Sequence, residues 1–298
     1  MKILVTGVGS HVGAYLARSY AREGHQVVAT YRAKKPGDFG ALDGIRMVKV
    51  DLADGPWNLE PVDVVIHAAA RTAWTTNPAS EYIRSNVLGT QNLAAYGKLN
   101  QPRVIFYFSS IAVHGEINAA ELCEDTPINR PDMYGSTKYM GEMIMEEHAE
   151  DFPSVTIRLP GVVGPGYFSP FIGRILRKAM ANEPIPIYNP DSMFNAVTDF
   201  AEVRAFISHV SESGYTGYRA VNLAGSEPMR LRDIVETIVS LVGSRSSISQ
   251  QQSSRGPFCI NTERVTREFG FQPATTQAIV ERYVNDNRIG LATAGGTV

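Results

Sequence analysis

The sequence predicts an α/β protein, a doubly wound parallel sheet with a smaller mixed α/β C-terminal cap. Two observations carry this prediction. In the first half of the chain, short apolar runs alternate with helical patterns, which is typical of parallel strands connected by helices. The first apolar run ends in a glycine-rich turn, and the alternation weakens after about residue 165.

The first half holds five expected strands, the first of which is apolar on both faces, as buried parallel strands are. They span residues 2–6, 26–31, 46–50, 62–67 and 103–108. A helix is expected over 12–23, because its apolar residues share one face and Gly24 follows as a stop signal.

Two longer helices follow. Asn77 precedes Pro78, which predicts an N-cap, a proline at the first helical position and a helix to about Lys98. Residues 133–151 are rich in good helix formers and predict a second helix. A sixth strand is expected over 155–159.

Beyond residue 165 the pattern becomes mixed. Short strands are expected at 185–188 and 218–223, and helices at 169–181 and 231–242. Residues 244–255 are polar and low in complexity and predict a surface loop, and the tail after Gly290 predicts irregular structure. We expect one domain over 1–165 with a return segment near 196–224, and a cap formed by 166–195 and 225–298.

Composition narrows the function classes. The chain has 298 residues, 44% of them hydrophobic and 19% charged, with a net charge of −2. This charge argues against a nucleic-acid partner bound through bulk positive charge. Cys123 and Cys259 form no metal-ligand pattern, so two free thiols and no metal site are expected. No apolar run is long enough for a membrane span, and no signal peptide is visible, so a cytoplasmic protein is expected.

The turn after the first strand predicts a phosphate-binding loop. Its candidate residues sit between a strand and a helix, where backbone N–H groups can meet a pyrophosphate. They are Gly7, Gly9, Ser10, His11, Val12 and Gly13. An ordinary structural turn is the alternative.

The end of the second strand indicates which dinucleotide binds. An acid that would bind the ribose of NAD is missing there, and Arg32, Lys34 and Lys35 follow instead. Cations suit a 2′-phosphate, so NADP(H) is favoured and NAD(H) stays open. A solvated basic loop is the alternative. Asp51 and Leu52, after the third strand, are candidates for contact with the adenine.

Two segments carry candidate catalytic residues. Tyr134 and Lys138 lie four apart near the start of a helix and so share one face, where a lysine cation lowers the pKa of a phenol. Tyr31 and Lys35 repeat the spacing outside a helix, where no shared face arises. Ser110 follows the strand at 103–108 and could donate a hydrogen bond to a substrate oxygen.

At this point the chain resembles the extended short-chain dehydrogenases/reductases of the NAD(P)-dependent epimerase/dehydratase family, which implies a Rossmann-like fold. The resemblance rests on motifs along the whole chain. They are the loop 6–13, Asp51-Leu52, His67-Ala68-Ala69-Ala70, Asn86-x-x-Gly89-Thr90, Ser109-Ser110-x-x-Val113-x-Gly115, Tyr134-x-x-x-Lys138, Arg158 with Gly164-Pro165-Gly166, Val197-x-Asp199 and Phe269-Gly270-Phe271-x-Pro273.

The resemblance implies roles for these residues. Tyr134 would act as acid/base, Lys138 would hold the nicotinamide ribose and tune Tyr134, and Ser110 would be the catalytic serine. Asn86 would support the helix of the site, and Ala68, Ala69 and Ala70 would line the cofactor site. The candidates for substrate binding are Arg71, Thr72, Ser110 and Tyr134. Further candidates are His114, residues 160–168, Arg174 and Arg177. The two long helices resemble the family's dimer-forming pair, so a homodimer is possible.

The chain also departs from the family pattern. Ser10 replaces the middle glycine of the loop, which puts cofactor affinity in question. His114 replaces an aromatic residue, and a packed or hydrogen-bonded histidine is favoured over a catalytic one. Residues 193–197 lack the arginine of many sugar-nucleotide enzymes, and no Asp-Glu pair follows Ser110, which argues against a dehydratase.

The leading hypothesis is an NAD(P)-dependent oxidoreductase that moves a hydride to or from a keto or hydroxy carbon of a sugar nucleotide or a related small carbonyl compound. The first alternative is a sugar-nucleotide epimerase with tightly held NAD and no net cofactor turnover. The second is a nucleotide-sensing protein without catalysis on the same fold.

Overall fold

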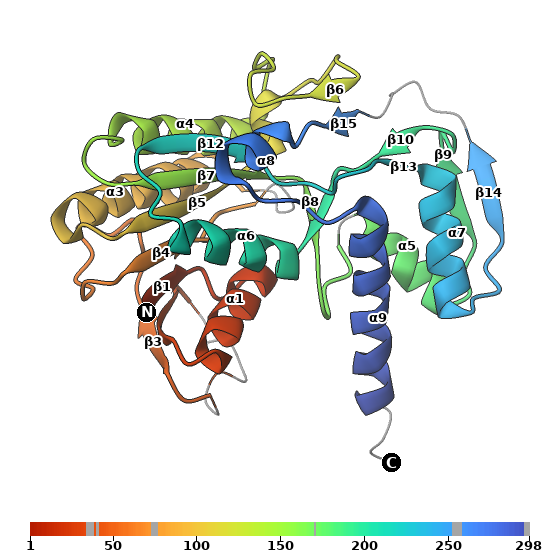
Figure 1. Ribbon diagram of the computed structural model, residues 1–298, viewed down its shortest axis with the longest axis horizontal. Helices are drawn as coiled ribbons and strands as arrows, with labels where there is room; N and C mark the ends of the chain where they lie inside the picture. Colours follow the sequence, from red (N-terminus) through yellow and green to blue (C-terminus); the bar gives the residue numbers. More distant parts are fainter. Residues whose placement is uncertain (34–38, 40–41, 73–76, 170, 252–257, 295–298) are drawn as a thin grey trace. The chain divides into compact units, whose positions relative to one another are not determined.

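The computed structural model describes residues 1–33, 39, 42–72, 77–169, 171–251 and 258–294. It contains a seven-stranded sheet in the order β12-β7-β5-β4-β1-β2-β3 (Figure 1). The strands are β1 (Lys2–Thr6), β2 (Gln26–Tyr31), β3 (Ile45–Lys49), β4 (Val64–His67), β5 (Val104–Ser110), β7 (Ser154–Leu159) and β12 (Tyr218–Asn222). The pairings from β3 through β2, β1 and β4 to β5 are all parallel. This architecture confirms the predicted fold class.

The order of the strands reverses between β1 and β4. From β1 the chain moves outward through β2 to β3, and then returns to place β4 on the other side of β1. Ligands of open α/β sheets bind in the crevice at such a reversal, outside the carboxyl ends of the strands. The loops after β1 and β4 therefore mark the expected site.

Helices cover both faces of this sheet. They are α1 (His11–Arg22), α2 (Ala79–Tyr82), the π-helix η1 (Ile83–Leu88), α3 (Gly89–Asn100), the 3₁₀ helix η2 (Ile111–His114), α4 (Met133–Glu147) and α6 (Phe200–Glu212). In Figure 1, α3 and α4 lie on one face, while α1 and α6 lie on the other. A hydrogen bond of 3.2 Å between the hydroxyls of Tyr20 and Ser208 joins α1 to α6.

The chain divides into two compact units. The first comprises Met1–Glu116, Pro127–Arg158 and Arg204–Val221, and the second Ile117–Thr126, Leu159–Val203 and Asn222–Val298. The first unit contains the sheet, so the return segment joins the sheet through α6 and β12. Its core includes apolar residues of β1, β4 and β5 packed against α3.

The second unit is built from short strands and amphipathic helices. Its elements are β6 (Glu121–Leu122), β8 (Gly161–Val163), α5 (Phe171–Met180), β9 (Ile185–Tyr188), β10 (Met193–Phe194), β11 (Val197–Asp199), β13 (Met229–Arg230), α7 (Leu231–Val242), β14 (Ile248–Gln251), β15 (Cys259–Ile260), α8 (Glu263–Phe269) and α9 (Thr276–Ala294). Its core brings together apolar residues of α5, α7 and α9.

The helix predicted from Asn77 to Lys98 differs from the observed structure. Pro78, not Asn77, is the N-cap residue, and it makes no side-chain capping bond. The helical path is then interrupted by the π-helix Ile83–Leu88 before α3 continues to Asn100. A π-turn adds one residue to the turn and so changes which side chains face inward.

Two predictions for the second unit were wrong. Residues 248–251, expected within a loop, form β14 and pair in parallel with β9. Backbone hydrogen bonds form this strand although Ser249, Gln250 and Gln251 expose their side chains, so polarity alone misled the prediction. The first residues of the tail after Gly290, expected to be irregular, continue helix α9 as far as Ala294, and residues 295–298 lie outside the described residues.

The structure also bears on the cysteines and on possible membrane spans. Cys123 and Cys259 are free thiols, as expected. No helix among the described residues is long and apolar enough to cross a membrane.

Candidate functional site

Helix α4 is held very close to β5 and η2. The carboxylate of Asp132 caps the helix by accepting a hydrogen bond of 2.7 Å from the N–H of Gly135. A Cβ atom on Gly135 would overlap the carbonyl oxygen of Ala112, and one on Gly141 would overlap the hydroxyl of Tyr107. Glycine at both positions therefore lets the helix carrying Tyr134 and Lys138 lie directly against the end of β5.

Ser110 and Tyr134 meet at this contact. Ser110 caps η2 by accepting a hydrogen bond of 3.2 Å from the N–H of Ala112, and its side chain is also hydrogen-bonded to Tyr134. Burial raises the pKa of Tyr134 to about 12, although the bond with Ser110 lowers it. The expected lowering of this pKa by Lys138 is thus not observed, because the desolvation of the phenol dominates.

Lys138 lies inward of Tyr134 on the same helix. Its side chain is 1% exposed, and its ammonium nitrogen sits 4.1 Å from the centre of the Tyr107 ring. Burial lowers the pKa of Lys138 to about 7, and Glu142 acts in the opposite direction. The ring of Tyr107 stacks on His67 at 5.8 Å, and His67 stacks on Trp57 at 6.0 Å.

A buried ion pair lies one turn further along α4. Glu142 accepts hydrogen bonds from Arg158, the shortest being 2.7 Å from Nη2 to Oε2, and another from the hydroxyl of Ser109. Nη1 of Arg158 lies 3.2 Å from Nε2 of His114, which is 1% exposed. Glu142 was not predicted as a site residue, although its spacing of four from Lys138 places it on the same helix face.

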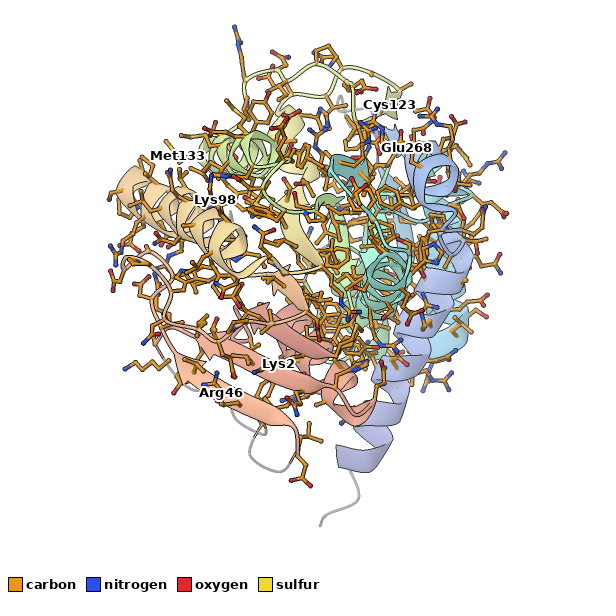
Figure 2. The ribbon with its side chains drawn as sticks, turned by 60° about the vertical axis from the view of Figure 1, so that its left-hand side comes forward. Lys2, Arg46, Lys98, Cys123, Met133 and Glu268 are labelled. Carbon is orange, nitrogen blue, oxygen red and sulfur yellow. The ribbon has the colours of Figure 1, made fainter. Side chains whose placement is uncertain are left out.

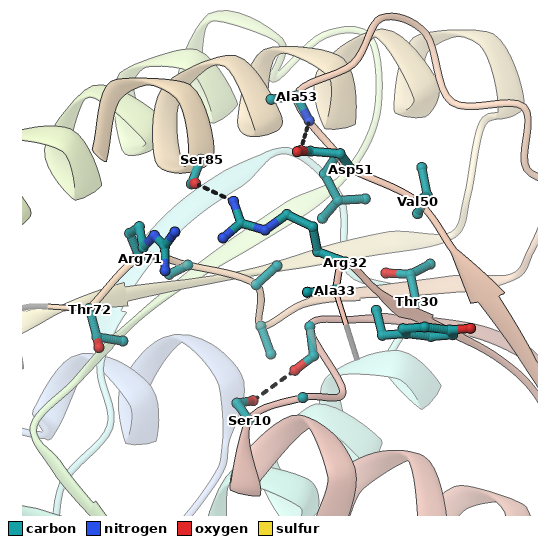
Figure 3. A pocket seen from close by; sticks show the side chains of 17 residues that line it. Ser10, Thr30, Arg32, Ala33, Val50, Asp51, Ala53, Arg71, Thr72 and Ser85 are labelled. Atoms are coloured by element: carbon teal, nitrogen blue, oxygen red, sulfur yellow. Dashed lines mark hydrogen bonds between the residues drawn. The ribbon is translucent and has the colours of Figure 1, made fainter. Parts of the chain in front are cut away.

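A cavity of about 480 Å³ opens at the reversal point of the sheet (Figure 3). Eleven predicted residues line it, namely Gly7, Gly9, Ser10, Arg32, Asp51, Leu52, Ala68, Ala69, Ala70, Arg71 and Thr72. Six lining residues were not predicted, namely Thr30, Tyr31, Ala33, Val50, Ala53 and Ser85. Most of these residues are next in sequence to a predicted one, so their position at the end of a strand could have identified them.

The glycine-rich loop forms one wall of the cavity. A Cβ atom on Gly9 would meet no atom within 4 Å, so the backbone there is open to a ligand. Ser10 caps α1: its hydroxyl accepts a hydrogen bond of 3.1 Å from the N–H of Gly13 and donates one of 2.9 Å to the carbonyl of Gly7. His11, Val12 and Gly13 belong to the first turn of α1 and are not among the lining residues.

Arg32 stands on the opposite wall. Its Nη1 donates a hydrogen bond of 3.4 Å to the hydroxyl of Ser85, and within the described part of the chain it has no carboxylate partner (Figure 3). Lys34 and Lys35 lie outside the described residues. Asp51, by contrast, accepts a hydrogen bond of 3.2 Å from Arg84, which also pairs with Asp54. The guanidinium of Arg32 is therefore available to an anion in the cavity.

Asn86 connects the cavity to helix α4. Its side-chain oxygen accepts a hydrogen bond of 2.7 Å from the N–H of Arg71, and its amide donates to the carbonyl of Arg71 and to the hydroxyl of Thr137, both at 3.1 Å. Arg71 also pairs with Glu81 at 2.9 Å. The π-helix thus presents Asn86 to both parts of the candidate site.

The remaining substrate candidates lie in the second unit. Within residues 160–168, the N–H of Gly166 donates to Asn287 at 2.9 Å, and the carbonyl of Tyr167 accepts from the hydroxyl of Tyr283 at 2.7 Å. Arg174 and Arg177 are exposed on α5.

The site residues of the first unit thus form two groups. One lines the cavity, and the other, Ser110, Tyr134 and Lys138, gathers where α4 meets β5. Both occur at the carboxyl ends of the strands.

A family model described as the NAD dependent epimerase/dehydratase family matches residues 3–223. The chain belongs to this family. Membership confirms the resemblance inferred from the motifs, and it makes the protein an enzyme of the NAD(P)-dependent oxidoreductase or epimerase kind.

The similar proteins are distant relatives of this chain. The chain is 22% identical to protein CapI of Staphylococcus aureus, with 96% of this chain and 98% of CapI covered. It is 28% identical to the dTDP-4-dehydro-6-deoxy-D-allose reductase of Streptomyces bikiniensis, with 81% of each chain covered. Among solved structures, the UDP-glucuronic acid 4-epimerase of Bacillus cereus in complex with NAD superposes with a TM-score of 0.79 at 19% identity, covering 96% of this chain and 98% of that one.

Proposed function

We propose that the protein is an NADP(H)-linked oxidoreductase that reduces a keto group, or oxidises the corresponding hydroxy group, of a sugar nucleotide. The observation that carries the chemistry is the hydrogen bond between Ser110 and Tyr134, with Lys138 buried one turn further along the same helix. The substrate class is supported by the similarity to the Streptomyces bikiniensis reductase.

The residues of the cavity fit a dinucleotide cofactor. The open backbone at Gly9 and the first turn of α1 would face the pyrophosphate, and the alanines after β4 complete this wall. Asp51 and Leu52 would lie at the adenine, and Arg32 would bind a 2′-phosphate. The cofactor, when bound, supplies or accepts the hydride at the substrate carbon.

Tyr134 would move the proton that accompanies this transfer. Because burial raises its pKa to about 12, the phenol is protonated near neutral pH and can donate a proton to a substrate carbonyl oxygen. Ser110 would donate a hydrogen bond to the same oxygen, and Arg71 and Thr72 are further candidates for substrate contact. In the oxidation direction Tyr134 must first lose its proton, so we expect that rate to rise with pH.

A screen of sugar nucleotides and simple carbonyl compounds, followed by the loss of NADPH absorbance, tests this proposal. Replacing Tyr134→Phe is expected to reduce kcat at least about 100-fold, because the proton donor is removed while the ring remains. Tyr139→Phe, on the same helix, is the matched control and should retain wild-type turnover. Undiminished turnover in the Tyr134 variant would falsify the acid/base assignment.

The cofactor preference is tested by binding rather than turnover. We expect NADPH to bind more tightly than NADH, and Arg32→Ala to weaken NADPH binding by about ten-fold or more while leaving NADH unchanged, since a charge-assisted hydrogen bond contributes roughly 1.5–3 kcal/mol. Arg103→Ala, outside the cavity, is the control. Fluorescence titration measures both constants, and a preference for NADH that Arg32→Ala leaves intact would contradict the assignment.

An epimerase is the second candidate, favoured by the similarity of fold to the Bacillus cereus 4-epimerase. An epimerase would interconvert two sugar nucleotides with no net change in NADPH or NADH. Product analysis by chromatography in the same screen separates the two candidates, because the reductase consumes one NADPH for each product molecule.

A second copy of the chain is the proposed partner. Exposed apolar side chains occur on the π-helix η1, on α3 and on α4, and Figure 2 shows α3 and α4 side by side next to the sheet. They are Ile83, Leu88, Leu99, Met133, Met140 and Met143. Exposed apolar side chains on neighbouring helices are typical of a protein interface when they form a continuous patch.

A further inference from the structure

The helix face that carries Tyr134 and Lys138 continues to a third charged residue. Glu142 follows Lys138 by four positions, as Lys138 follows Tyr134, so the three side chains project from successive turns of α4. Glu142 is 2% exposed, and it takes no part in the proton transfer proposed for Tyr134. A buried carboxylate requires strong partners to remain ionised.

Those partners come from two strands. Nε of Arg158 on β7 donates to both carboxylate oxygens of Glu142, at 3.0 and 3.2 Å, and Nη2 donates to Oε2 at 2.7 Å. Ser109, the neighbour of Ser110 on β5, donates its hydroxyl proton to Oε1. Because a guanidinium only donates and stays charged, this arrangement fixes Glu142 as a carboxylate.

Glu142 supplies the negative charge that raises the pKa of Lys138. The other titratable groups around Lys138 are neutral or cationic. Tyr107 on β5 and Tyr134 on α4 are protonated phenols, since burial raises both pKa values. His67 on β4 is neutral, because burial and the charge of Lys138 lower its pKa to about 3. Arg158 on β7 is paired with Glu142, and Nε2 of His114 on η2 accepts from Arg158.

We propose that Glu142 is a positioning residue of this site, which keeps the buried ammonium of Lys138 charged and fixes α4 beside Ser110. The proposal rests on the proposed function, because it assigns Glu142 a task in the same Ser110–Tyr134–Lys138 group. The carboxylate acts along the helix on Lys138 and across to β5 through Ser109. Arg158 holds it in place and keeps it ionised.

The charge on Lys138 can be measured without turnover. The chain has seven lysines, so ¹³C-lysine labelling gives a sparse NMR spectrum in which the Cε shift reports each protonation state. The Lys138 signal is assigned by its loss in Lys138→Arg. We expect Glu142→Gln to lower the pKa of Lys138 by about one unit or more, as loss of a nearby opposite charge does. Glu147→Gln, exposed on the same helix, is the control and should leave the titration unchanged.

A second variant covers the case in which Glu142→Gln fails to fold because the buried Arg158 loses the charge of its carboxylate partner. The double variant Glu142→Gln with Arg158→Met removes both charges together. Lys138 should still titrate at lower pH in this variant than in the wild type, because the charge of Glu142 raises the pKa of Lys138. An unchanged Lys138 titration in either folded variant overturns the proposal.

The pH dependence of turnover separates this proposal from the proposed function. If Lys138 must be charged, the high-pH limb of the reduction rate moves to lower pH in Glu142→Gln by the shift that NMR measures. A shifted titration with no turnover on any substrate contradicts the proposed function and leaves the role of Glu142 supported. An unshifted titration in an active variant contradicts the role of Glu142 alone.

Discussion

Lys138 holds its ammonium group inside the first unit, over the ring of Tyr107. Burial disfavours the charged form of Lys138 and therefore lowers its pKa to about 7. The folded protein therefore binds a proton at Lys138 less tightly than the unfolded chain, whose lysines titrate near 10.4. It follows that stability increases with pH between about 7 and 10, where the unfolded chain binds the extra proton.

The increase of stability with pH leads to a prediction for the variant Lys138→Met. The variant removes the buried charge while keeping an apolar stem, so it should stabilise the protein at pH 6 by about 1–4 kcal/mol, since each unit by which burial lowers the pKa of Lys138 reflects about 1.4 kcal/mol against the charged form. The gain should shrink toward pH 10, where wild-type Lys138 is neutral. Urea unfolding at the two pH values measures the difference. Lys178→Met, on a different helix, is the control, and a gain that is equal at both pH values would contradict the burial argument.

At the residue scale, the sequence indicated the position of Tyr134 and Lys138 but not their electrostatics. Helical spacing correctly predicted a shared face. It did not reveal that Lys138 packs over Tyr107, nor that desolvation sets the pKa of Tyr134. Both facts depend on residues of β4 and β5 that are far away in the sequence, so local pattern could not supply them.

Helix α4 is the element on which the candidate chemistry depends. It touches β5 at Gly141, where a side chain would overlap the hydroxyl of Tyr107. That contact sets the height of Lys138 above the Tyr107 ring, since Lys138 lies less than one turn before Gly141. The helix can approach this closely only because the contact position carries hydrogen in place of a side chain.

We therefore expect Gly141→Ala to lift α4 from the sheet. Overpacking of this kind costs about 1–3 kcal/mol of unfolding free energy. Turnover should fall more than cofactor binding does, because the cavity is lined by other elements. Thermal unfolding and NADPH titration measure the two effects. Glu147→Ala, on the exposed end of the helix, should change neither, and an unaffected melting temperature in Gly141→Ala would rule out the close contact.

The elements that the sequence predicted well are those with a strong apolar period. Strands β1, β2 and β5 and helices α1 and α7 begin and end within two residues of their expected limits. The π-helix and β14 were missed for physical reasons. The π-helix lets Asn86 reach Arg71 and Thr137, which are distant in the sequence. Strand β14 is held by its backbone pairing with β9 and by the packing of Ile248, while its other three side chains are exposed.

At the scale of the whole molecule, the alternation of strands and helices was enough to predict the sheet and the location of its binding crevice. The contents of the crevice were largely predicted as well, because the lining residues follow the strands directly. The sequence did not predict the residues that support the candidate catalytic group of Ser110, Tyr134 and Lys138. Glu142, Arg158 and His114 come from three elements, and only the tertiary fold places them together.

The oligomeric state gives a prediction at this scale. Replacing Met140→Glu and Met143→Glu places two charges on the exposed apolar surface of α4, where the wild-type side chains are 45% and 53% exposed. Burying these charges between two copies is unfavourable, so the variant should be monomeric while the wild type is dimeric. Light scattering after gel filtration measures both masses. Arg103→Ala should leave the mass unchanged, and a monomeric wild type would contradict the proposed interface.

The stack of Trp57, His67 and Tyr107 beneath Lys138 also gives the protein a built-in optical reporter. The chain has two tryptophans, Trp57 and Trp74, so Trp74→Phe leaves a single indole at the base of this stack. Its emission then depends on the packing that supports the buried ammonium. Changes around Lys138 thereby become visible in a fluorimeter before any substrate is known.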